Sequence, residues 1–152
     1  IQSCGSKHSP MFNSLGVACD MWDTIGRQSI QDYILSLAMR LKNAIAGRWG
    51  TRALYAPKDD PELVSALTSF SPFFWDPAAI RSSSISGTFV SRLLNEYGIV
   101  VRNTTVPVPN SAGVLENHYP IRVSTHLWHS ARDVDTFFEA ASDLAVKMSE
   151  GR

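Results

Sequence analysis

The sequence predicts an α+β fold, in which a small and mainly antiparallel sheet carries helices on one face. Three observations lead to this prediction. Apolar residues recur at helical spacing in four separate segments. Shorter segments between them are rich in apolar and β-branched residues, as strands are. Proline, glycine and asparagine gather in the connections. A chain of 152 residues is long enough for one domain with its own core.

Two helices are expected first. Ser9 and Pro10 suit the start of a helix, because serine can cap it and proline fits its first turn. Gly26 ends that helix. The second helix carries one apolar stripe over residues 30–45, and two glycines follow it. The first helix fits the α+β layer least well, so it is expected to lie at an interface or against another domain.

A β-hairpin is expected after the second helix. Residues 52–56 and 63–70 are β-compatible, and a turn rich in proline and aspartate separates them. A third helix is expected from Ser84 onward, with Gly98 as the residue that ends it. A strand over residues 99–102 follows.

The last third of the chain is expected to contain a loop, a strand and a helix. Residues 104–118 hold prolines, asparagines and a glycine, which predicts a loop. Residues 121–127 alternate between an apolar and a polar face, which predicts a half-buried strand. Ser130 and Asp133 have the spacing of a capping box at the start of a final amphipathic helix.

Composition excludes several classes of function. Fourteen basic residues balance fourteen acidic ones, so no nucleic-acid or membrane partner is expected. Cys4 and Cys19 have no metal-ligand spacing and fit reduced thiols in a cytoplasmic protein. The four histidines form no metal-binding pattern, so no metal is expected. The chain begins with Ile1, which hints at an excised, cleaved or split piece of a longer protein.

Arg122 is the best local candidate for a functional residue. It lies in the middle of a predicted strand whose other face is apolar. This face could simply be solvated, or Arg122 could pair with a carboxylate on a neighbouring strand. In the functional interpretation, its planar guanidinium points into a cleft and grips a substrate carboxylate with two hydrogen bonds. His126 lies on the same face and could help to line that pocket, with hydrogen-bonding support as its expected role.

Two segments of the chain carry a resemblance to a known family. Residues 97–102 and 121–135 resemble the "gI.vR" and "iR.S...YNt..Did" patterns near the end of class V aminotransferase-like enzymes, which use pyridoxal phosphate (PLP). Residues 5–10 and the helix after them resemble the "GTRDpsp" stretch of the isopenicillin N epimerase-like branch. Ser6 and Lys7 stand in place of its threonine and arginine, and His8 departs from its acidic residue.

The resemblance implies a set of binding residues. Arg122 would bind the α-carboxylate of an amino-acid substrate. Gly5 and Ser6 would contact the cofactor phosphate across the interface of a homodimer. Residues 1–27 would form an interface segment and helix that joins the large domain, and residues 28–152 the C-terminal small domain. The lysine that binds PLP would lie in a large domain that precedes Ile1 or in a partner chain, and Lys7 would not replace it.

The expected function is therefore that of a substrate-binding part rather than a complete enzyme. No catalytic residue is expected in this chain, and it is not expected to be active alone. The complete enzyme would be an epimerase or a C–S lyase, and desulfuration and aminotransfer stay open. Neither cysteine is near Arg122 in the sequence, which argues mildly against a desulfurase. The alternative is a non-catalytic α+β module that binds carboxylates or another protein.

Overall fold

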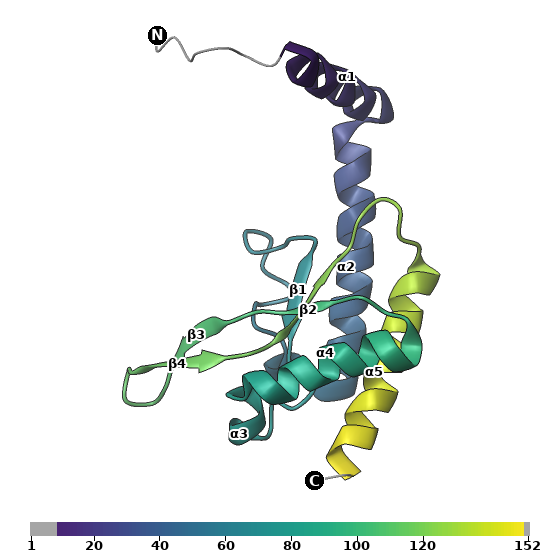
Figure 1. Cartoon of the computed structure of the whole chain (residues 1–152). Coiled ribbons are helices and arrows are strands. Elements are labelled where there is room, and N and C mark those ends of the chain that lie inside the picture. The colour runs from purple at the N-terminus through teal and green to yellow at the C-terminus, as the bar shows by residue number, and fades with distance from the viewer. Residues whose placement is uncertain (1–8, 151–152) are drawn as a thin grey trace. The chain divides into compact units, whose positions relative to one another are not determined.

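The computed structural model describes residues 9–150 and has an α+β fold, as the sequence predicts (Figure 1). The chain divides into two units, residues 1–33 and residues 34–152. The elements in chain order are α1 (Ser9–Ile25), α2 (Arg27–Trp49), the 3₁₀ helix η1 (Thr51–Ala53), β1 (Leu67–Phe70), α3 (Pro77–Ile80), α4 (Ser83–Tyr97), β2 (Arg102–Asn103), β3 (Val106–Pro109), β4 (Leu115–His118), β5 (Ile121–Ser124) and α5 (Ala131–Glu150).

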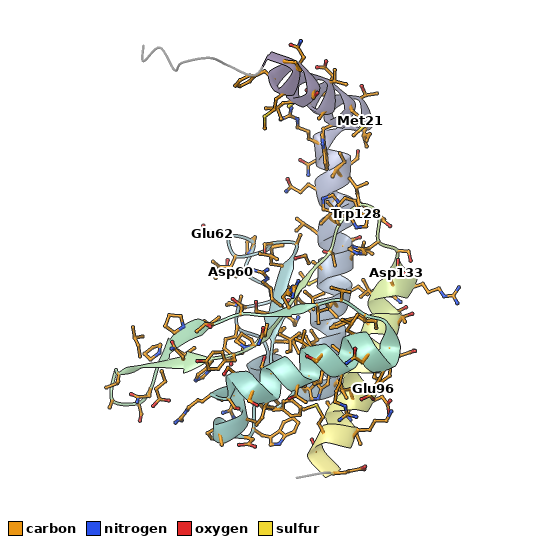
Figure 2. The ribbon with its side chains drawn as sticks, in the orientation of Figure 1. Met21, Asp60, Glu62, Glu96, Trp128 and Asp133 are labelled. Carbon is orange, nitrogen blue, oxygen red and sulfur yellow. The ribbon has the colours of Figure 1, made fainter. Side chains whose placement is uncertain are left out.

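The first unit consists of α1 and the beginning of α2. Gly26 separates the two helices and has a φ of 93°, a conformation that favours glycine, which confirms the predicted end of the first helix. Many large apolar side chains of α1 are exposed, among them Met11, Leu15 and Met21 (Figure 2). The predicted boundary at residue 27 lies six residues before the observed division at residue 33.

The second unit is built around a three-stranded antiparallel sheet with the strand order β1-β5-β2. The central strand β5 alternates as predicted, because Ile121 is buried and Arg122 is exposed. The strand is shorter than predicted and ends at Ser124. β2 pairs with only two residues of β5, so the third strand covers only the first half of β5.

The helices α2, α4 and α5 share one apolar core with the sheet. Phe70 of β1 is fully buried, and its ring contacts Trp49 of α2 and Phe137 of α5. Phe89 of α4 is also fully buried. The buried face of the sheet therefore faces the helices, and the face that carries Arg122 does not. Burial of aromatic rings of this size supplies much of the free energy of folding.

The predicted ends of α4 and α5 are confirmed. The Ser82 hydroxyl accepts a hydrogen bond from the backbone of Ile85, and Gly98 ends α4 with a φ of 69°. The Asp133 carboxylate accepts hydrogen bonds from the backbone and the hydroxyl of Ser130, at 2.7 and 2.8 Å. This capping box fixes the start of α5.

The predicted hairpin over residues 52–56 and 63–70 is largely wrong. Residues 51–53 form η1, Leu54 makes an isolated bridge to Phe70, and β1 pairs with β5 instead. The predicted turn between the two segments is present, where the Asp60 carboxylate accepts a hydrogen bond from the backbone of Glu62 (Figure 2).

The predicted loop over residues 104–118 is also wrong, because it contains the hairpin β3–β4. Proline is compatible with this hairpin because each of its strands pairs on one side only. The Asn110 side chain accepts hydrogen bonds from the backbone of Ala112 and Val114, which closes the turn. The predicted strand over residues 99–102 is reduced to Arg102–Asn103.

No helix among residues 9–150 combines the length and the apolar character needed to cross a lipid bilayer. Cys19 carries an exposed free thiol. Cys4 lies outside the described residues.

Candidate functional site

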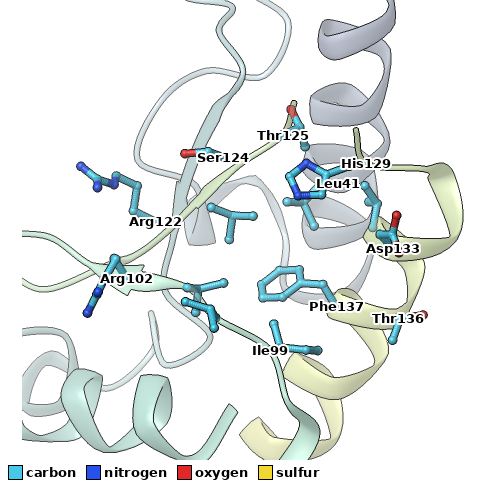
Figure 3. A pocket seen from close by; sticks show the side chains of 14 residues that line it. Leu41, Ile99, Arg102, Arg122, Ser124, Thr125, His129, Asp133, Thr136 and Phe137 are labelled. Atoms are coloured by element: carbon cyan, nitrogen blue, oxygen red, sulfur yellow. The ribbon is translucent and has the colours of Figure 1, made fainter. Parts of the chain in front are cut away.

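A cavity of about 450 Å³ lies where β5, the segment 99–102 and the first turns of α5 meet (Figure 3). It exists because β2 pairs with only the first half of β5. Its wall is mainly apolar and includes Leu41, Ile99, Val123 and Phe137. An apolar wall with a few polar groups is the usual character of a small-molecule site.

Two arginines form one end of this cavity. Arg102 of β2 lies directly opposite Arg122 of β5 in the antiparallel register, and both line the cavity. Within the part of the chain that the structure describes, neither guanidinium has an ion pair or a hydrogen-bond partner. Arginine stays charged at any physiological pH. This end of the cavity is therefore an uncompensated positive site.

The opposite end carries Thr125, His129 and Asp133 (Figure 3). The hydrogen bonds from Ser130 hold the pKa of the Asp133 carboxyl below its ordinary range, so this group is negative. The Nδ1 atom of His129 accepts a hydrogen bond of 2.9 Å from the backbone of His126. In the neutral ring the proton then sits on Nε2. The cavity is thus positive at one end and negative at the other.

Of the two predicted substrate-binding residues, the structure places only one at the cavity. Arg122 lines the cavity, and His126 does not. The alternation that would put His126 beside Arg122 stops at Ser124, where β5 ends, and the His126 ring stacks on Trp128 instead, with centroids 3.5 Å apart. His129 takes a place in the lining. Gly5 and Ser6 lie outside the described residues.

Arg102 is the site residue that sequence reasoning passed over. Its strand was expected, but its importance depends on the register that sets it opposite Arg122. The final arginine of the segment 97–102 was the available signal, because it is part of the same pattern that points to Arg122.

A second polar pair borders another cavity, of about 500 Å³, beside the β3–β4 hairpin. The Tyr55 hydroxyl lies 3.0 Å from Nδ1 of His118. Burial raises the pKa of Tyr55 to about 12. Burial, and then the nearby Arg81, lower the pKa of His118. Both groups are therefore neutral at physiological pH, and no sequence pattern indicated this pair.

The described lysines do not fit a covalent PLP site at the arginine-ended cavity. None of them lines it. Lys42 is almost fully buried, and its ammonium group donates a hydrogen bond to the Ser65 carbonyl. Lys58 and Lys147 pair with Asp59 and Asp143. The described lining of this cavity therefore contains two guanidinium groups that could bind an acid and an apolar wall, but no lysine amine that could bind PLP covalently.

No group of three or more potential metal ligands occurs among residues 9–150. No protein-family model and no curated protein matches this sequence.

Proposed function

We propose that this chain binds the carboxylate of an amino-acid substrate in the arginine-ended cavity. We further propose that it does so as the C-terminal part of a PLP-dependent enzyme of the class V aminotransferase-like group, in the cytoplasm. The observation that carries the first proposal is Arg122, a charged residue that has no partner among residues 9–150 and lines a cavity large enough for a small molecule.

The chemistry of Arg122 supports a carboxylate as the ligand. Its guanidinium presents parallel N–H donors that match the two oxygens of a carboxylate. A charge-assisted hydrogen bond is worth about 1.5–3 kcal/mol, and the solvent exposure of Arg122 places it at the low end of that range. The strand β5 fixes the direction of the side chain, since its backbone pairs on both sides at Arg122.

The proposed role within an enzyme is orientation. PLP, when bound, supplies an electron sink for reactions at the α-carbon of an amino acid. Arg122 would hold the α-carboxylate, and the wall that includes Val123 and Phe137 would exclude water from the substrate side chain. Epimerisation and C–S lysis remain the proposed reaction types. The homodimer contact through Gly5 and Ser6 remains part of the same proposal.

A non-catalytic carboxylate-binding module is the second candidate. The observation that favours it is the composition of the cavity, whose described lining contains no lysine. Both candidates need Arg122, and they differ in whether a PLP-binding segment completes the site.

A titration of the isotope-labelled chain followed by NMR tests the carboxylate proposal. L-glutamine should shift the signals of residues around Arg122, and L-glutaminamide, which lacks the carboxylate, should not. Arg122→Gln should weaken binding about tenfold, equal to about 1.4 kcal/mol. The affinity of Arg122→Lys should lie between those of the unchanged chain and Arg122→Gln, because an ammonium group is positive but lacks the planar pair of donors. Equal shifts by the two ligands would overturn the proposal.

Arg48→Gln is the matched control, because Arg48 is an exposed arginine that does not line this cavity. It should bind L-glutamine as the unchanged chain does. The enzyme proposal has its own test, in which the complete gene product is purified and assayed for bound PLP by absorbance and phosphate content. A product without PLP would leave only the carboxylate-binding module.

A further inference from the structure

We propose that Arg102 is a specificity-determining residue, and that the ligand of the cavity is an acidic amino acid with a second carboxylate for Arg102 to bind. This inference rests on the proposed function, because it assumes that Arg122 binds the first carboxylate. It adds the class of substrate, which a single arginine leaves open.

The first step is the charge pattern across the sheet. Ser69 of β1, Arg122 of β5 and Arg102 of β2 occupy opposing positions in neighbouring strands. This row therefore consists of one hydroxyl and two guanidinium groups, with no carboxylate. Like charges directly opposite each other on neighbouring strands destabilise a sheet. The stability of the sheet does not favour this pair, and no acid among residues 9–150 offsets it.

The second step is the absence of an acid within reach. Neither Arg102 nor Arg122 pairs with an acid in residues 9–150, although Asp133 lines the same cavity. Figure 3 shows Asp133 at the end of the cavity away from both arginines. Two positive charges that lie at one end of a cavity, and that pair with no acid among the described residues, are complementary to a ligand with two negative charges.

The third step decides between one doubly charged group and two separate carboxylates. In Figure 3 the two arginine side chains leave neighbouring strands and their guanidinium groups turn apart. A single phosphate would need both groups to converge on it. Two carboxylates on one short carbon chain can each meet one guanidinium, and each would keep the two-oxygen geometry that arginine prefers.

The experiment compares L-glutamate with L-glutamine, which have nearly the same shape and differ by one carboxylate. Dissociation constants are measured by NMR titration of the full chain at low ionic strength. We expect L-glutamate to bind about tenfold more tightly, as one further charge-assisted contact predicts. Arg102→Gln should abolish this preference, and Arg48→Gln should keep it. Arg102→Lys should keep part of the preference.

The outcomes separate the two proposals. If L-glutamine binds through Arg122 but L-glutamate binds no better, the dicarboxylate inference fails and the proposed function stands. A preference that survives in Arg102→Gln also overturns the inference. If inorganic phosphate displaces L-glutamate at much lower concentration than L-glutamine does, a single dianionic group is the ligand and the inference is wrong. If neither amino acid binds, the proposed function itself fails.

Discussion

Tyr55 and His118 join the segment after η1 to β4 through a hydrogen bond of 3.0 Å between the Tyr55 hydroxyl and Nδ1 of His118. Their rings also meet edge to face, with centroids 5.8 Å apart. The raised pKa of Tyr55 keeps its hydroxyl protonated, so Tyr55 donates this hydrogen bond and His118 accepts it. A protonated His118 could not accept it.

This relationship predicts a loss of stability at mildly acidic pH. The pKa of His118 in the folded state is lowered from 6.5, so below that value the unfolded state binds more protons. The stabilisation is present above 6.5 and is lost as the pH falls toward the lowered pKa. Urea unfolding at pH about 7.5 and about 5.5 measures the change.

In His118→Asn the part of this pH dependence that belongs to His118 should disappear. Tyr55→Phe should lose about 0.5–1.5 kcal/mol at neutral pH, the worth of one hydrogen bond. An unchanged pH profile in His118→Asn would show that another group causes the acid sensitivity.

Arg102→Gln is expected to raise the stability of the free chain. The substitution removes a positive charge directly opposite Arg122, and such a pair costs roughly 0.2–1 kcal/mol. The gain should shrink in high salt, because ions screen exposed charges. Thermal unfolding at low and high salt checks both statements. Arg48→Gln, which removes an arginine elsewhere, should give no gain, and a loss of stability in Arg102→Gln would contradict the prediction.

Phe70→Ala is expected to destabilise the second unit by about 3–5 kcal/mol. Phe70 is fully buried between Trp49 and Phe137, so its removal leaves a cavity in the core. Leu67→Ala is the matched control, because Leu67 lies on the same strand with 48% of its surface exposed. Chemical denaturation measures both variants. If Leu67→Ala lost as much stability as Phe70→Ala, the side of β1 that carries Leu67 would have to face the core.

Ser130→Ala is expected to lower the free energy of unfolding by about 0.5–2 kcal/mol, because it removes a helix cap. The Ser130 hydroxyl donates to the Asp133 carboxylate and accepts from the Asp133 backbone, so the substitution removes both of these hydrogen bonds and leaves the one from the Ser130 backbone N–H to the carboxylate. Chemical denaturation measures the cost. Glu139→Gln, an exposed change on the same helix, should be close to neutral. Because the cap lowers the pKa of Asp133 from 3.8, its contribution is present above that pH and is lost below it.

The sequence could predict the helices because their evidence is local. Apolar spacing, Gly26, Gly98 and the pair Ser130–Asp133 each act within a few residues, and the structure confirms all of them. Strand pairing is not local. The partner of β1 is β5, more than fifty residues later in the chain, and no turn signal could indicate it.

The candidate site shows the same division. The alternation of residues 121–124 set Arg122 on the exposed face, as expected. The position of Arg102 depends on its register with β5, and the place of His129 depends on the early end of β5 at Ser124. Both positions depend on tertiary structure. The sequence therefore indicated Arg122 but not the other charged and polar residues that line the cavity.

Lys42→Met is expected to raise stability at neutral pH by roughly 1 kcal/mol, since it removes a buried charge and keeps an unbranched chain of similar length. Lys42 is 3% exposed, and its ammonium group donates a hydrogen bond of 3.1 Å to the Ser65 carbonyl. Burial lowers the pKa of Lys42 from 10.5, so the charged form is less favourable in the folded chain than in water. The carbonyl that loses its donor belongs to an exposed residue and can bind water instead.

The pH profile gives the sharper test of Lys42. With a lowered pKa in the folded state, the unfolded chain holds more protons below 10.5, so the stability of the unchanged chain rises as the pH rises toward that value. This rise should be weaker in Lys42→Met. Lys147→Met removes an exposed lysine that pairs with Asp143, and it should neither raise stability at neutral pH nor flatten the rise. A loss of stability in Lys42→Met with the rise intact would mean that the hydrogen bond to Ser65 outweighs the cost of burying the charge.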